Sequence, residues 1–85
     1  MMEQRIGVIS HYYSKLFVGA IVLEGELKIG DTIHIKGHTT DFTQKVESIQ
    51  IEHDNVTHAK KGDDIAIKVK DHVREHDVVY RVTEE

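Results

Sequence analysis

The sequence predicts a single all-β domain, folded as a closed antiparallel barrel of six strands. Its 85 residues provide enough chain for one small domain and too little for two. Apolar residues alternate with polar ones along most of the chain, which is the period of a strand with one buried face. Six such segments recur about every ten residues, separated by turn residues, a spacing typical of barrels.

The alternation locates the six strands in order. After Asp31, Ile33 and Ile35 alternate with His34 and Lys36, and the segments DIAIKVK and VVYRV repeat this pattern. No segment has the apolar face of a helix. The predicted strands are 5–10, 16–23, 31–37, 42–51, 64–70 and 77–82.

The second strand contains LFVGAIVL, which is apolar on both faces. Such a strand is expected to be covered on both sides. Gly19 within it predicts a bend or a close approach of another backbone segment.

The fourth strand changes phase along its length. Phe42 and Val46 are at even positions, whereas Ile49 and Ile51 are at odd ones, so the two pairs would face opposite sides of a regular strand. A β-bulge around Glu47-Ser48 would turn both pairs toward the core, because a bulge inserts one extra residue.

Three similar dipeptides each precede a strand: Gly30-Asp31, Gly62-Asp63 and His76-Asp77. Glycine supplies the positive φ of a tight turn, and aspartate accepts hydrogen bonds from nearby backbone N–H groups. We therefore interpret all three as turns, with a structural role first.

Composition excludes several classes of protein. The chain has 11 Lys and Arg against 15 Asp and Glu, a net charge of −4, so it lacks the overall basic charge of most nucleic-acid binders. Cysteine is absent, which excludes disulfides and thiolate sites. The chain has neither a signal peptide at its start nor a long apolar segment. We expect a cytoplasmic protein that does not associate with a membrane.

Histidine is unusually frequent. If all seven titrated normally, the net charge would rise from −4 to +3 around pH 6.5. Scattered surface histidines are the ordinary explanation, and a pH sensor or a metal site is the alternative. The histidines are His11, His34, His38, His53, His58, His72 and His76.

The segment His72-Val-Arg-Glu75-His76 matches the zinc-protease pattern H-x-x-E-H. That pattern binds zinc only on a helix, and the short connection between two predicted strands has no room for one. The phosphate loop of nucleotide hydrolases and the nucleophile elbow are also absent. We predict a protein that is not an enzyme, with no cofactor, no metal and no bound nucleotide.

Two loops carry candidate binding residues. The loop around His38, Thr40 and Asp41 offers polar groups beside Phe42, for recognition of RNA or a protein, or simply as a capped hairpin with Phe42 in the core. Tyr12 and Tyr13 in the first loop offer a contact surface, or pack over the barrel mouth.

Lysines form the third group of candidates. If their strands are neighbours, outward-facing lysines would make a basic stripe for RNA phosphates, and the alternative is ordinary surface solvation. The candidates are Lys36, Lys45, Lys68 and Lys70 on strands, with Lys60 and Lys61 in a loop.

The chain resembles a known family over roughly residues 5–82. The segment GELKIGDTIHIKG, at residues 25–37, is similar to the second domain of translational GTPases such as elongation factor Tu and initiation factor Two. The chain also resembles small translation-elongation-factor-like proteins and the C-terminal barrel of U32-family peptidases. The matching residues are Gly7, Val8, Gly25, Leu27, Gly30, Asp31, Ile33, Ile35, Gly37, Ala59, Gly62, Asp63 and Ile65.

The resemblance implies a six-stranded Greek-key barrel without GTPase activity. It departs from the family at His76, where glycine is usual, so the last turn is expected to differ, and in the long stretch between Gly7 and Gly25. The implied function is a non-catalytic module that contacts tRNA, ribosomal RNA or a translation factor. The alternatives are an accessory domain that binds a protein such as a U32-type peptidase or an RNA-modifying enzyme, and a histidine-based metal or small-molecule binder.

Overall fold

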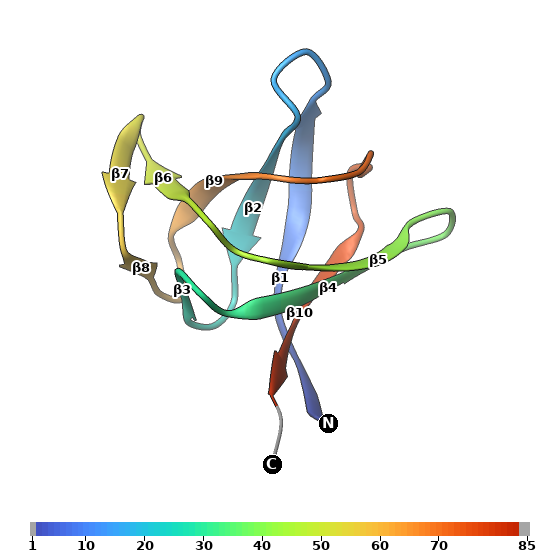
Figure 1. Ribbon diagram of the computed structural model, residues 1–85, viewed down its shortest axis with the longest axis horizontal. Helices are drawn as coiled ribbons and strands as arrows, with labels where there is room; N and C mark the ends of the chain where they lie inside the picture. The colour runs from blue at the N-terminus through green and yellow to red at the C-terminus, as the bar shows by residue number, and fades with distance from the viewer. Residues whose placement is uncertain (1, 84–85) are drawn as a thin grey trace.

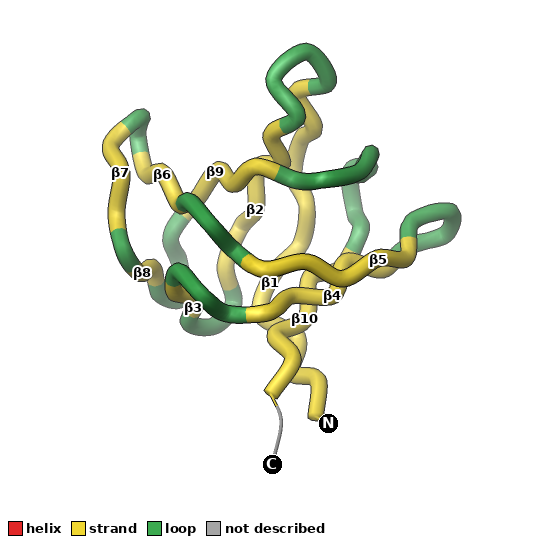
Figure 2. The backbone as a smooth tube through the Cα atoms, in the orientation of Figure 1, coloured by secondary structure: helices red, strands yellow, loops and turns green. Residues whose placement is uncertain are grey.

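The computed structural model describes residues 2–83, in which every regular element is a strand (Figures 1 and 2). The all-β prediction is therefore confirmed. None of the described elements is a helix of the length and hydropathy needed to cross a membrane. The ten strands are β1 (Met2–Tyr13), β2 (Val18–Leu23), β3 (Leu27–Lys28), β4 (Thr32–Lys36), β5 (Asp41–Lys45), β6 (Ile49–Ile51), β7 (Asp54–Val56), β8 (His58–Ala59), β9 (Asp64–Lys68) and β10 (Val78–Thr83).

Eight strands form one antiparallel sheet in the order β5-β4-β10-β1-β2-β9-β6-β7, and β3 pairs with β8 separately. The last strand, β10, lies between β4 and β1 in this sheet. The sheet curls strongly (Figure 1). Within residues 2–83, however, no ladder joins the end strands β5 and β7. The prediction of a closed six-stranded barrel is therefore wrong in strand number and in closure.

The three strands that the sequence did not predict are β3, β7 and β8. Each has only two or three residues, too few to show an alternating pattern. The predicted strand 42–51 is divided into β5 and β6 by Val46–Ser48. Because of this break, Val46 and Ile49 are both buried despite their opposite parity. The predicted irregularity is confirmed as an interruption between two strands.

The core lies inside the curl of the sheet. Its members are aliphatic side chains from inward positions of the strands, with Val46, Val69 and Val73 from the connecting segments. The second predicted strand is covered on one face only: Ile21 and Leu23 are buried, whereas Val22 is 43% exposed. The expectation that both faces are covered is wrong, because none of the residues 2–83 forms a layer on the outside of β2.

The three predicted turns have the same construction. In each, a backbone N–H donates to the carboxylate of the aspartate three residues later, from Lys28 to Asp31, Lys60 to Asp63 and Arg74 to Asp77, at 2.8–3.0 Å. The aspartate N–H donates back to the carbonyl of the first residue at 3.0–3.1 Å. The same turn is therefore built three times.

The third turn forms although His76 replaces glycine. His76 adopts φ +76°, close to the +95° of Gly30 and Gly62. The expectation that this turn differs is therefore wrong. A side chain at positive φ is strained, and the hydrogen bonds of Asp77 hold the turn in this conformation.

Replacing His76 with glycine is expected to stabilise the domain by about 0.5 kcal/mol. Glycine removes the left-handed strain of about 1 kcal/mol but gives the unfolded chain more freedom. Urea unfolding measures the difference, with Gly30→Ala as the matched opposite change at the equivalent position. A loss of stability in His76→Gly would show that the imidazole makes contacts that outweigh the strain.

Gly37 lies directly against the buried side chain of Asp77. A Cβ atom at Gly37 would come within 1.8 Å of the Asp77 Oδ1 atom and 2.6 Å of its Cγ. Asp77 in turn is fixed by its turn and by its carbonyl, which accepts a hydrogen bond from Ile9 N–H at 2.8 Å. This contact joins the end of β4 to the turn before β10.

Candidate binding surfaces

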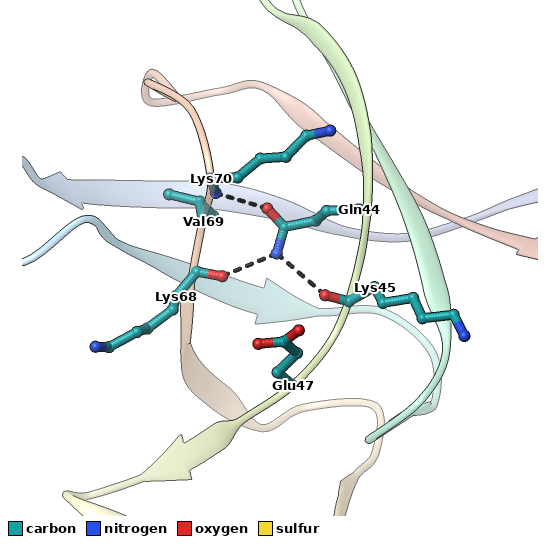
Figure 3. A pocket seen from close by; sticks show the side chains of 6 residues that line it. All are labelled: Gln44, Lys45, Glu47, Lys68, Val69 and Lys70. Atoms are coloured by element: carbon teal, nitrogen blue, oxygen red, sulfur yellow. Dashed lines mark hydrogen bonds between the residues drawn. The ribbon is translucent and has the colours of Figure 1, made fainter.

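Three of the six candidate lysines surround one cavity of about 380 Å3. Lys45 comes from β5, and Lys68 and Lys70 come from the end of β9 and the residues after it. Gln44, Glu47 and Val69 complete the lining (Figure 3). The predicted basic stripe is therefore present in part.

The amide of Gln44 lies at the centre of this cavity (Figure 3). Its Nε2 donates to the Lys68 carbonyl at 2.9 Å and to the Lys45 carbonyl at 3.4 Å, and its Oε1 accepts from Lys70 N–H at 2.8 Å. One side chain thus connects β5 to the end of β9, where the strand ladder has a gap. Both N–H groups of the amide and one acceptor site of its oxygen are thus used within the fold.

The charged groups of the cavity do not converge on one point. The ammonium groups of Lys45 and Lys68 point in different directions, and the carboxylate of Glu47 lies between these two residues (Figure 3). Lys70 Nζ lies 5.9 Å from the centre of the Phe42 ring. The cavity therefore resembles a surface of mixed charge more than a compact anion site.

The other candidate lysines lie elsewhere. Lys36 pairs with Asp41 at the opposite end of β5 from Lys45. Lys60 and Lys61 precede β9, at the opposite end of that strand from Lys68. A continuous stripe through all six lysines is not formed.

The polar loop between β4 and β5 is a tight hairpin connection. Thr40 is buried, and its carbonyl accepts a hydrogen bond from Gly37 N–H at 2.7 Å. His38 is exposed, and Phe42 packs against the core. Phe42 therefore turns toward the core as the hairpin interpretation expected, whereas the hydrogen bond at Thr40 is made by its backbone carbonyl and not by a capping side chain. His38 and Asp41 are exposed polar groups of this hairpin.

Asp41 belongs to a cluster that the sequence analysis missed. His34 on β4 lies between two carboxylates: its Nδ1 is 2.9 Å from Glu3 Oε2, and its Nε2 contacts Asp41 Oδ1. Only the pairing of β1, β10 and β4 brings Glu3 to His34, so the sequence spacing gave no signal. The one indication in the sequence was that His34 alternates with Ile33 and Ile35, which predicts that its side chain faces outward.

Two groups of the cluster, His34 and Asp41, have shifted pKa values. The hydrogen bond that Asp41 accepts from the His34 ring raises the pKa of His34 above its ordinary value of 6.5, with burial opposing this effect and Glu3 adding to it. The bond to His34 lowers the pKa of Asp41 below 3.8, against a smaller effect of desolvation, with the charges of His34 and Lys36 adding to the lowering. The ionised pair is therefore favoured in the folded protein.

The cluster predicts a pH-dependent stability. The pKa of His34 is higher in the folded than in the unfolded protein. Its contribution to the free energy of unfolding is therefore complete below pH 6.5 and is lost as the pH rises through the pKa of the folded protein. The contribution of Asp41 is present above pH 3.8 and is lost as the pH falls through its lowered value. His34→Gln should therefore reduce the free energy of unfolding more at pH 5.5 than at pH 9, in urea titrations at both pH values. His38→Gln is the control, and an equal loss at both pH values would contradict the assignment.

Tyr12 and Tyr13 are the last two residues of β1, so their predicted place in a loop is wrong, and they have different environments. Tyr12 is half-buried and packs on His72, with ring centres 4.6 Å apart. Tyr13 is exposed and lies edge-on to His11 at 4.4 Å. Packing down over the fold is thus confirmed for Tyr12, whereas Tyr13 stays available to a partner.

The segment 72–76 forms part of the loop between β9 and β10. His72 and Arg74 line a cavity of about 280 Å3 with Thr40 and Asp41, and a second one of about 580 Å3 with Tyr12. Within residues 2–83, no group of three or more histidines and carboxylates is arranged to hold a metal ion. Both hollows are open to solvent and share His72 and Arg74 in their lining.

Comparisons with known proteins agree on the fold. The sequence model of the family described as Elongation factor Tu domain 4 matches residues 4–80. The C-terminal domain of a Geobacillus thermoleovorans protein assigned to the U32 peptidases superposes with a TM-score of 0.89 at 18% identity, covering 94% of this chain and 93% of that one. At this identity the structural match supports the fold alone.

Two curated relatives are closer in sequence. An uncharacterised protease of Methanocaldococcus jannaschii is 45% identical over 80 residues, which are 93% of this chain and 20% of that protein. A collagenase of Porphyromonas gingivalis is 49% identical over 72 residues, which are 82% of this chain and 20% of that protein. The chain therefore spans about a fifth of the length of the curated relatives that it matches.

Proposed function

Because the chain belongs to the elongation factor Tu domain 4 family, we propose that it is a non-catalytic binding module that serves a larger peptidase-type protein. The observation that carries this proposal is the match of nearly the whole chain to about a fifth of two proteins named as proteases. A segment of this size shared among longer enzymes is more consistent with an accessory role than with the catalytic centre.

The site chemistry supports a binding role. The Gln44 amide is used in structural hydrogen bonds, and His34 is held between two carboxylates on the outside of the sheet. A nucleophile activated by either group would need to lie within hydrogen-bond distance, and their hydrogen bonds are made instead to backbone groups and carboxylates. These groups are thus explained by folding and surface electrostatics.

The test uses the Methanocaldococcus jannaschii protease from which the 80 matching residues have been removed. We expect this truncated protein to bind the isolated chain in a calorimetric titration, and the chain alone to cleave neither gelatin nor casein. Cleavage by the purified chain would contradict the non-catalytic role. Absence of binding would contradict the accessory role.

The lysine cavity supports a second candidate, binding of tRNA or ribosomal RNA in the cytoplasm. Lys45, Lys68 and Lys70 place three cationic side chains around one cavity. Each phosphate contact through such a group releases counterions, so binding should weaken steeply with salt.

Charge reversal tests the RNA candidate. The double variant Lys68→Glu/Lys70→Glu is expected to weaken binding of bulk tRNA by more than tenfold at 50 mM salt, since each reversal removes an attraction and adds a repulsion. Lys60→Glu/Lys61→Glu is the control with the same change of charge at the far end of β9. Equal losses in both variants, or binding that does not respond to salt, would exclude the cavity as an RNA site.

A further inference from the structure

The hairpin between β1 and β2 presents large apolar side chains to solvent. Leu16 is 63% exposed, Phe17 60% and Tyr13 48%, all within five residues. The hairpin projects beyond the rest of the sheet (Figure 1). Contiguous apolar groups in such a position commonly mark an interaction site.

The tip of this hairpin is held in a fixed and strained conformation. Phe17 adopts φ +54°, which is rare for a bulky residue. Its carbonyl accepts a hydrogen bond from Val69 N–H at 2.9 Å, and Leu16 N–H donates to the Tyr13 carbonyl at 3.1 Å. The hydrogen bond from Val69 thus ties the strained backbone of Phe17 to the body of the fold. Backbone strain of this kind is found at functional sites.

A groove of about 350 Å3 runs beside the tip. One wall is Tyr13 and Leu16 from the first hairpin, and the other is the β6–β7 turn with Glu52. The floor is the cross-strand pair Ala20 and Ala66, whose small side chains leave it hollow. This volume accommodates one or two large apolar side chains, within the size range of binding pockets.

Acidic groups border the groove. Glu52 and Asp64 are part of its lining and are exposed, and His53 lies between Glu52 and Asp54 at the turn. Carboxylates at this position repel phosphates and attract ammonium or guanidinium groups. The lining therefore favours a cationic partner and disfavours RNA.

We propose that this groove binds an extended protein segment that carries a large apolar side chain next to lysine or arginine. The apolar side chain would enter between Leu16 and the Ala20–Ala66 floor, and the cation would contact Glu52 or Asp64. The inference deepens the proposed function, because it assigns the surface through which a binding module would contact a polypeptide.

Selection from a phage library of random 12-residue peptides tests the proposal directly. Peptides enriched on the wild-type chain should contain a large apolar residue flanked by Lys or Arg. In fluorescence anisotropy, Leu16→Ser and the groove-filling Ala66→Phe should each weaken a selected peptide at least tenfold, as expected for an anchor contact. Asp64→Lys should weaken it as well, whereas Ile29→Ala, which alters an exposed apolar residue elsewhere, should not.

Circular dichroism melting of each variant confirms that it is folded. Enrichment of acidic peptides, no enrichment, or binding unchanged in both Leu16→Ser and Ala66→Phe would overturn the proposal. Two further results would overturn it: binding of the tip to phosphatidylcholine vesicles without any peptide binding, and self-association that Leu16→Ser abolishes without any peptide binding.

The truncated protease separates this inference from the proposed function. If it binds the wild-type chain and Leu16→Ser with equal affinity, the groove proposal fails and the accessory role stands. If it does not bind at all while selected peptides bind in the groove, the accessory role fails and the groove proposal stands.

Discussion

Replacing Gly37 with alanine is expected to destabilise the domain by about 3 kcal/mol, at the upper end of the range for overpacking. The new Cβ atom would lie 1.8 Å from Asp77 Oδ1, so the buried carboxylate would have to move. Its movement would weaken the hydrogen bond from Arg74 N–H, which is 2.8 Å long. The change would therefore loosen the turn that leads into β10.

Urea unfolding of the variant measures this loss, and Gly30→Ala provides the comparison. A Cβ atom at Gly30 meets no atom within 4 Å, so only its φ of +95° is strained and a loss of about 1 kcal/mol is expected. In a double-mutant cycle, Gly37→Ala should cost less in an Asp77→Ala background, because the clash is gone. Strict additivity of the two changes would show that the close contact does not limit stability.

Replacing Gln44 with leucine is expected to cost about 1.5 kcal/mol. Leucine has nearly the same volume but cannot hydrogen-bond to the Lys68 carbonyl or to Lys70 N–H, which would lose their protein partner. The contact between β5 and the end of β9 depends on this side chain. Amide hydrogen exchange should therefore accelerate at Lys70 more than at Ile35, which is in the body of the sheet.

Gln44→Glu is the matched control for this prediction. A glutamate can still accept from Lys70 N–H, but it cannot donate to the Lys68 carbonyl, so the loss should be intermediate. If leucine, glutamate and the wild-type glutamine give the same midpoint in urea, the bridge contributes nothing to stability.

The sequence predicted those features that depend on local spacing. The opposite parities of Val46 and Ile49 identified the break between β5 and β6, and the repeated aspartates identified three turns of one construction. Alternation gives the buried face of a strand because neighbouring side chains point to opposite sides. These are properties of a few consecutive residues.

The features that were missed depend on which strands become neighbours. The contact of Glu3 with His34 spans 31 residues, and the bridge from Gln44 to Lys68 spans 24. The exposure of Val22 depends on the absence of a second layer over β2, which an apolar sequence alone cannot reveal. Lysine positions likewise indicated outward faces, while the pairing of strands decided which lysines lie around one cavity and which lie elsewhere.

The position of β10 between β4 and β1 has a consequence for synthesis of the chain. The last strand of the domain pairs along its length with the first, from Met2 with Thr83 to Val8 with Val78. A nascent chain on the ribosome therefore exposes the facing edges of β1 and β4 until residues 78–83 have left the exit tunnel. Such sequence-distant pairing slows folding and leaves apolar strands exposed meanwhile. The sheet of this domain is thus completed only when β10 takes its place between β1 and β4.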